Sequence, residues 1–242
     1  MATVLIGTSG FSYQHWRGIF YPDGLPQQRW LEFYAGQFPT VELNVTFYRL
    51  PSEKAVQSWQ RRVPADFIYA AKLSRLITHS HRLHDAEEAL ALFLARMRLL
   101  GEHLGPILIQ LPPNMRADIN LLDSFLLKCD PDLRWAVEFR SADWLHDATY
   151  DVLRRHHVAL CIHDLLPDHP LEITAPFTYL RFHGAGQRYS GDYPDAFLRT
   201  WAGRLRAWQA QSLDAFAYFN NDIGGYAVKN ARTLQAMFDK AA

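Results

Sequence analysis

Short hydrophobic segments alternate with amphipathic segments along nearly the whole chain. Eight of the hydrophobic segments are rich in Val, Ile, Phe and Tyr, which strands favour. They begin near Val4, Val41, Phe67, Ile107, Trp135, Val158, Phe177 and Ala215. Between most of them, apolar residues recur at helical spacing, over residues 30–38, 86–100, 197–208 and 227–238. Strands that alternate with helices predict a parallel sheet with right-handed crossovers.

The number of strands distinguishes between two parallel architectures. Eight strands close a TIM-type (β/α)8 barrel, and an open doubly wound sheet is the alternative. The segment after the first strand, Gly7-Thr8-Ser9-Gly10, does not match the G-x-G-x-x-G fingerprint of dinucleotide-binding open sheets. We therefore predict an α/β fold, a single TIM-type barrel domain over residues 1–242. Residues 165–176, between the sixth and seventh strands, are rich in Pro and Asp, so we expect no full helix there.

Polar residues occupy one face of most predicted strands. Because side chains alternate in direction along a strand, Glu138 and Arg140 share one face of the fifth strand and Val137 and Phe139 share the other. The same parity selects Glu42, Asn44, Lys72, Gln110, Cys161, His163, Arg181, His183, Tyr218 and Asn220 in the other strands. Helices cover the outside of a barrel, so the aliphatic face must point outward and this polar set into the lumen.

The polar set falls late in its strands, at the end where barrel active sites form. Burying a charge costs several kcal/mol unless the charge is well paired. Two interpretations follow: a solvated ligand site at the C-terminal mouth, or an internal salt-bridge network that fills the barrel. We favour the ligand site.

Four residues of the set are candidates for catalysis, namely Glu42, Glu138, His183 and Lys72. Glu42 and Glu138 could form an acid–base pair, although neighbouring arginines would hold both carboxylates ionised. Lys72 could act as a base or a Schiff-base amine if burial lowered its pKa, whereas pairing with a carboxylate would keep it protonated. The candidates for substrate binding in the strands are Asn44, Gln110, Arg140, Arg181 and Asn220.

The loop after the first strand, residues 11–21, is rich in aromatic residues. We assign Tyr13 and Trp16 of this loop to substrate binding, since aromatic rings stack on sugars and bases. The alternative is a lid packed over the first helix. His163 and Asp164 are suitable ligand types for a divalent metal, but they lack a compact motif and nearby arginines oppose a cation. We therefore assign no metal and leave the cofactor open.

Composition narrows the class of partner. Lys plus Arg and Asp plus Glu both total 25, so the formal net charge is zero and argues against a nucleic-acid binder. Residues 75–82 nevertheless form a local basic segment. The two cysteines lack zinc-finger or disulfide spacing and are typical of reduced thiols in a cytoplasmic protein. The chain shows neither a signal peptide nor an apolar run long enough to span a bilayer, so we expect no membrane partner.

Several short motifs follow one another along the chain, namely Gly7-Thr8-Ser9-Gly10, Val41-Glu42-Leu43-Asn44, Thr46-Phe47-Tyr48, Gln110-Leu111-Pro112-Pro113, Val137-Glu138-Phe139-Arg140, His183-Gly184 and Tyr218-Phe219-Asn220-Asn221-Asp222. These motifs in this order resemble the YecE-like family, the proteins of "domain of unknown function 72". The resemblance covers essentially the whole chain. It implies a TIM-type barrel and a pocket formed by most of the polar set, and it carries no activity that can be transferred.

Three functions are consistent with these patterns. The first is an enzyme that acts on a small polar or anionic substrate. Arg140, Arg181 and Lys72 would hold the anion, and Glu42 or Glu138, with His183, would move protons; a hydrolase is slightly favoured over a lyase. The second is a metal-dependent protein that processes or binds nucleic acid, using the basic segment. The third is a non-catalytic metabolite-binding protein.

Overall fold

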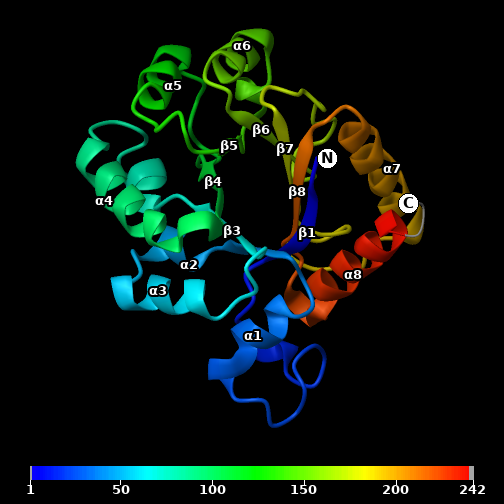
Figure 1. Ribbon diagram of the computed structural model, residues 1–242. Helices are drawn as coiled ribbons and strands as arrows, with labels where there is room; N and C mark the ends of the chain where they lie inside the picture. The colour runs from blue at the N-terminus through cyan, green and yellow to red at the C-terminus, as the bar shows by residue number, and fades with distance from the viewer. Residues whose placement is uncertain (1, 240–242) are drawn as a thin grey trace.

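The computed structural model describes residues 2–239, which form a closed barrel of parallel strands surrounded by helices (Figure 1). The strands are β1 (Val4–Ser9), β2 (Thr40–Leu43), β3 (Ile68–Lys72), β4 (Leu104–Gln110), β5 (Trp135–Glu138), β6 (Ala159–His163), β7 (Phe177–Phe182) and β8 (Asp214–Phe219). Each strand pairs with the next in the sequence, and β8 closes the barrel by pairing with β1. The predicted TIM-type (β/α)8 barrel is confirmed.

Helices form a ring outside the strands (Figure 1). They are α1 (Trp30–Ala35), α2 (Val45–Tyr48), α3 (Glu53–Arg61), α4 (Glu87–Met97), α5 (Ile119–Leu126), α6 (Asp147–Arg155), α7 (Asp195–Ala210) and α8 (Tyr226–Asp239). Short helical turns η1 to η6 cover Gln14–Trp16, Gln27–Arg29, Leu76–Ser80, Arg98–His103, Ala142–Trp144 and Ile223–Gly225. The four predicted helical segments correspond to α1, α4, α7 and α8. As expected, no helix lies in the fully described link between β6 and β7.

Local capping explains where two of the other helices begin. The Ser52 side chain accepts a hydrogen bond from the Ala55 amide at the start of α3, and the Asp118 carboxylate accepts one from the Leu121 amide at the start of α5. Side chains of this kind satisfy backbone N–H groups that have no partner within the helix. Among residues 2–239, none of the helices combines the length and the hydropathy needed to cross a bilayer.

The two faces of the strands build two different interiors. The outward face is aliphatic, and Val137, Leu180 and Phe182 pack with helix residues such as Leu198 and Leu205 in the main hydrophobic core. On the inward face, a smaller apolar cluster fills the N-terminal end of the lumen. That cluster contains Ala70, Leu108, Ala136, Cys161, Phe177, Tyr179, Phe216 and Tyr218. The lower lumen is therefore closed by side-chain packing, and polar groups occupy only its upper part.

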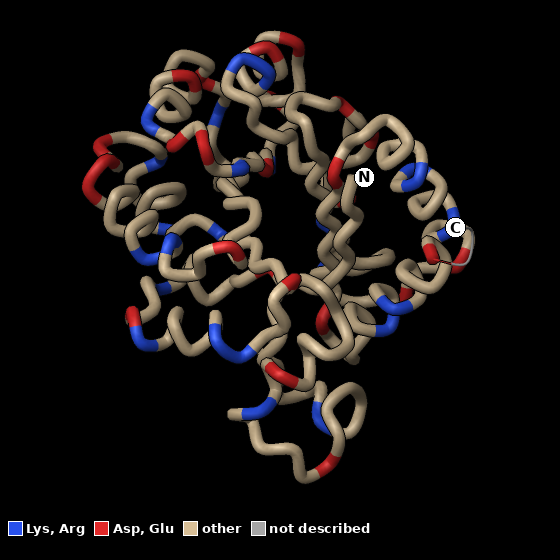
Figure 2. The backbone as a smooth tube through the Cα atoms, viewed as in Figure 1, with Lys and Arg blue, Asp and Glu red and all other residues tan. Residues whose placement is uncertain are grey.

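Positive and negative positions are interspersed along the outer helices in the view of Figure 2. Their totals are equal, so the formal net charge is zero. The notable charges of this protein are those inside the barrel.

Candidate functional site

A layer of paired charges lies above the apolar part of the lumen. Arg181 of β7 donates from Nη1 to Oε2 of Glu138 at 2.6 Å and from Nη2 to Oε1 of Glu42 at 2.8 Å. Arg140 contacts the other oxygen of Glu138, and the Tyr179 hydroxyl donates to the other oxygen of Glu42 at 2.6 Å. Glu42, Glu138 and Arg181 are each at most 1% exposed. We name these paired groups, Glu42, Glu138, Arg140 and Arg181, the charge layer.

The pairing fixes the ionisation of this layer. Burial by itself would raise the pKa of the Glu138 carboxyl, but Arg140 and Arg181 outweigh burial and hold that pKa well below its ordinary value. The same carboxylates raise the pKa of Arg181 well above normal, against the effect of burial. Glu138 is thus a permanently ionised partner and a poor general acid.

His183 lies just beyond β7 and is fully buried beside the charge layer. Its Nδ1 is 3.0 Å from the Asn220 amide nitrogen, and its Nε2 is 3.6 Å from Oε2 of Glu138. Burial lowers the pKa of His183 to about 3, so the imidazole is neutral near pH 7. With Asn220 donating to Nδ1, the ring proton sits on Nε2 and faces Glu138.

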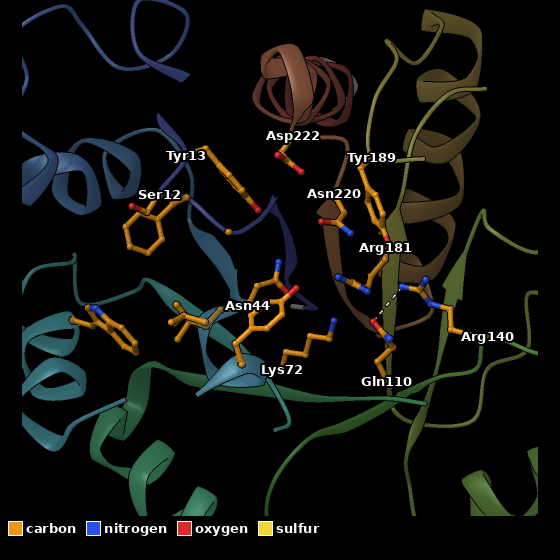
Figure 3. Close-up of a pocket in the computed structure, with 16 residues that line it drawn as sticks. Ser12, Tyr13, Asn44, Lys72, Gln110, Arg140, Arg181, Tyr189, Asn220 and Asp222 are labelled. Carbon is orange, nitrogen blue, oxygen red and sulfur yellow. Dashed lines mark hydrogen bonds between the residues drawn. The ribbon is translucent and has the colours of Figure 1, made fainter. Parts of the chain in front are cut away.

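A cavity of about 690 Å³ opens above the charge layer, at the C-terminal ends of the strands (Figure 3). Its lining residues are Gly10, Phe11, Ser12, Tyr13, Leu43, Asn44, Val45, Tyr48, Trp59, Lys72, Gln110, Arg140, Arg181, Tyr189, Asn220 and Asp222. Figure 3 shows Lys72, Gln110 and Arg181 on one side and Asp222 on the opposite side. The cavity is therefore polarised, with cations at one wall and a carboxylate across from them.

Lys72 differs from the other charges of the barrel because it makes no ion pair within the described chain. It is the last residue of β3, the residue is 8% exposed, and its Nζ lies 4.1 Å from the centroid of the Phe47 ring. Burial lowers the pKa of Lys72 to about 7, with a further lowering by Arg181 that Glu138 and Glu42 partly oppose. In the described residues Lys72 forms no ion pair with Glu42 or Glu138. Arg181 contacts one oxygen of each carboxylate, and Tyr179 and Arg140 contact the other oxygens.

Asn44 presents an unused acceptor at the cavity. The Ser9 hydroxyl donates its proton to Glu42, so Ser9 Oγ can only accept from Asn44 Nδ2, at 2.9 Å, and from Arg181. This network fixes the orientation of the Asn44 amide. Its Oδ1 is buried and has no hydrogen-bond partner within the described residues. A buried acceptor without a partner is costly, and a ligand that donates a hydrogen bond would satisfy it.

Gln110 and Arg140 form the floor on the cationic side. Arg140 donates to Oε1 of Gln110 at 3.2 Å, an interaction drawn as a dashed line in Figure 3. Arg140 uses its Nε for Glu138, which leaves its Nη1 without a partner in residues 2–239. Both side chains are thus oriented by the charge layer and keep free N–H groups for a ligand.

The two aromatic candidates of the first loop have different places. Tyr13 lines the cavity and donates from its hydroxyl to the Ser9 carbonyl at 2.6 Å. Trp16 is fully buried and donates from Nε1 to the Asp222 carbonyl at 2.9 Å, so it supports the loop after β8 and does not reach the cavity. The first loop is therefore packed structure with Tyr13 at its inner surface.

His163 and Asp164 are engaged in hydrogen bonds away from the cavity lining. His163 Nε2 is 2.7 Å from the Phe139 carbonyl oxygen, and Asp164 accepts from the His183 amide at 2.8 Å and from the Tyr193 hydroxyl. Among the residues that the structure describes, no group of three or more His, Cys, Asp or Glu side chains is placed to hold a metal ion. The basic segment 75–82 also lies outside the cavity lining.

Nine of the lining residues were not predicted as site residues from the sequence, and three of these nine are aromatic residues outside the first loop, namely Tyr48, Trp59 and Tyr189. Tyr48 belongs to the Thr46-Phe47-Tyr48 motif directly after β2, so its position in a conspicuous aromatic motif was an available signal. Trp59 comes from α3 and Tyr189 from the long link after β7. Neither position follows a strand closely enough for parity to predict it.

Comparisons with known proteins agree with the fold and the motifs. A family described as a protein of unknown function, DUF72, matches residues 5–242. The UPF0759 protein YunF of Bacillus subtilis (strain 168) is 25% identical, and the match covers 90% of this chain and 90% of that protein. The crystal structure of a DUF72 family protein from Thermotoga maritima MSB8 is 28% identical with a TM-score of 0.88, covering 98% of this chain and 99% of that one. A second DUF72 structure, from Enterococcus faecalis V583, is 22% identical with a TM-score of 0.84, covering 98% and 96%.

The names of these relatives state no activity, so they support the fold without specifying a reaction. The family match nevertheless spans nearly every residue of the barrel, including all the strands that supply the charge layer and the cavity. The chain belongs to the DUF72 family.

Proposed function

We propose that the protein is an enzyme that binds a small polar, anionic substrate in the cavity and transfers a proton through Lys72. The observation that carries this proposal is the position of Lys72, a buried amine without an ion-pair partner in the described chain, at the wall of a cavity of about 690 Å³. Buried charges are normally paired, and those that are not cluster at functional sites.

The charge balance indicates what the ligand must supply. The two carboxylates and two guanidinium groups of the charge layer neutralise one another. A protonated Lys72 adds a positive charge that an anionic group of the ligand would balance. Asp222 on the opposite wall and the Oδ1 atom of Asn44 beside Lys72 would accept hydrogen bonds (Figure 3). The ligand that fits best therefore has an acidic group at one end and hydroxyl or amine donors at the other.

Lys72 is the best placed of the four catalytic candidates. Its pKa of about 7 matches the value that suits a general base near neutral pH. Glu138 is held ionised, Glu42 is occupied by Arg181 and Tyr179, and His183 does not line the cavity. We assign these three residues to positioning and electrostatic support.

This assignment changes the preferred reaction class. Hydrolysis by a carboxylate pair needs one protonated carboxyl group, which the ionised Glu138 does not provide. An amine base beside a bound anion suits abstraction of a proton from substrate carbon. We therefore place a lyase-type reaction ahead of the hydrolase that the sequence slightly favoured.

A thermal-shift assay tests the binding step. The wild type is heated with inorganic phosphate, sugar phosphates, hydroxy acids and 2-oxo acids, each near neutral pH. A ligand at 100 times its Kd contributes about 2.7 kcal/mol, which corresponds to a rise in Tm of roughly 5–10 °C for a chain of this size. We expect at least one anion to produce such a rise, and Lys72→Met to remove it.

Lys54→Met is the matched control, because Lys54 is exposed on α3 and does not line the cavity. It should retain the full shift. Absence of any shift, or equal shifts in the wild type and Lys72→Met, would contradict the proposal. A shift without turnover of the bound compound would favour the non-catalytic metabolite-binding alternative.

A further inference from the structure

We infer that Lys72 is a nucleophile that forms an imine with the carbonyl carbon of an anionic aldehyde or 2-oxo acid, whose acidic group Arg140 and Gln110 would hold. This inference rests on the proposed function, because it names the substrate class of the same cavity. It keeps the anion-binding cavity and assigns a covalent step to the Lys72 Nζ atom in place of proton abstraction by the free amine, because a nitrogen bonded to substrate carbon no longer acts as that base.

The first support is that nothing in the described chain occupies the amine. The Nζ atom lies over the Phe47 ring and makes no hydrogen bond or ion pair with residues 2–239. Two other lysines, Lys128 and Lys229, pair with Glu87 and Asp192 at the surface. A buried amine that is free of partners at a cavity wall is available to a ligand in a way that a paired one is not.

The second support is the arrangement of the neighbouring charges. A lysine that only binds an anion is best kept protonated by a nearby carboxylate. Here both nearby carboxylates, Glu42 and Glu138, are held by Arg181. Burial and the two guanidinium groups then leave Lys72 with a pKa of about 7, so about half of the amines are neutral at pH 7. The neutral amine is the form that attacks a carbonyl carbon.

The third support is the set of groups around the amine. Figure 3 shows Lys72 extending toward the side of the cavity that holds Arg181 and Gln110, with Arg140 beyond Gln110. The free Nη1 group of Arg140 and the amide of Gln110 are donors suited to a carboxylate or phosphate. The unpartnered Oδ1 of Asn44 could accept a hydrogen bond from the hydroxyl group of a carbinolamine.

The step balances without any external oxidant or reductant. The neutral Lys72 amine attacks the carbonyl carbon and forms a C–N bond, while the electron pair of the C=O π bond moves to oxygen. That oxygen takes up a proton, and the nitrogen loses one, to give a carbinolamine. Loss of water then breaks the C–O bond and leaves a protonated imine, with one proton taken up overall. The imine keeps the positive charge beside the charge layer and withdraws electrons from the neighbouring carbon.

Borohydride trapping followed by peptide mass spectrometry tests this step. Wild-type protein is incubated at pH 7 with pyruvate and, separately, with glyceraldehyde 3-phosphate, and is then reduced. Lactate replaces pyruvate as the matched acid without a ketone. The variants are Lys72→Arg, which keeps a cation but cannot form the imine, and Lys54→Arg as the exposed control. Peptide mapping of the adduct in the wild type locates the modified lysine even if a variant folds poorly.

We expect the reduced adduct at Lys72 with at least one carbonyl probe, at a level at least ~10-fold above that at Lys54. A fully hydrated lysine has a pKa of about 10.4, so at pH 7 its neutral fraction is about a thousandfold smaller than that of Lys72. An amine of low pKa is a weaker nucleophile, which offsets part of that difference. Lys72→Arg should show no adduct, and Lys54→Arg should match the wild type. Lactate should form none and should compete with pyruvate.

An adduct spread equally over exposed lysines, or none at Lys72 with either probe, would overturn the inference. The thermal-shift assay separates this failure from failure of the proposed function. If anions raise the Tm through Lys72 but no adduct forms, only the imine step is refuted. If no anion of the thermal-shift panel raises the Tm and neither carbonyl probe is trapped, both proposals fail.

Discussion

Replacing Lys72 with Met should stabilise the protein, and the gain should be larger at pH 6 than at pH 9. The folded protein lowers the pKa of Lys72 from 10.5 to about 7, chiefly by burial. Because this pKa is depressed, the destabilising effect of the buried amine is complete below about pH 7. It disappears as the pH rises toward 10.5, where the unfolded chain also loses its proton.

The size of the effect follows from the shift. At about 1.4 kcal/mol per unit, the penalty is about 5 kcal/mol at pH 6 and about 2 kcal/mol at pH 9. The difference between the variant and the wild type should therefore shrink by about 3 kcal/mol between these two pH values. Attraction of the ammonium to the Phe47 ring reduces the gain in unfolding free energy of Lys72→Met at any one pH. The test therefore uses the change in this gain between pH values.

Urea or guanidinium unfolding of the wild type, Lys72→Met and Lys54→Met at pH 6, 7.5 and 9 measures this difference. Lys54→Met should follow the wild type at every pH, because Lys54 is exposed. Unfolding free energies of the wild type and Lys72→Met that run parallel across the pH range would refute the reasoning. They would mean that Lys72 keeps the same protonation state in the folded and unfolded chains.

Three further substitutions test the rest of the site. Glu138→Gln leaves Arg140 without a carboxylate and Arg181 with Glu42 alone, so we expect a loss of about 3–5 kcal/mol in denaturant unfolding, whereas a neutral effect would show that the ion pairs of Glu138 are dispensable. Arg140→Gln should weaken binding of the anion found by thermal shift by about 10–100-fold, measured by calorimetry, and unchanged affinity would remove Arg140 from the site. Trp16→Phe removes the hydrogen bond to the Asp222 carbonyl and should lower stability by about 1 kcal/mol with little change in affinity.

The order of strands and helices could be predicted because hydrophobic residues recur at a different spacing in strands than in helices. Most strands begin within a residue or two of the predicted positions, such as Phe177 for β7 and Trp135 for β5. The strand β4 begins at Leu104 instead of Ile107, because Gly105 and Pro106 interrupt the apolar pattern. The helix α3 was not predicted, since Val56 is its one buried residue and one position makes no stripe.

The candidate site could be predicted only in part, because parity fixes the face of a side chain and not its depth. It correctly directed Glu42, Glu138 and Arg181 into the lumen. It could not show that these charges are paired with one another beneath the cavity. Both interpretations of the polar set therefore apply, the salt-bridge network lower in the lumen and the open pocket above it. The first loop packs against the loop after β8, and this contact buries Trp16. The two loops are far apart in the sequence, so no local sequence pattern predicts the contact.

The most direct test of the account is an NMR titration of the lysine side chains in the folded wild type, with the Lys72 resonance assigned by its loss in Lys72→Arg. The account predicts that Lys72 titrates near pH 7 and that a bound 2-oxo acid removes or shifts this titration. A Lys72 resonance that titrates near pH 10, unaffected by any anion, would contradict the claim that the cavity holds an unpaired and reactive amine.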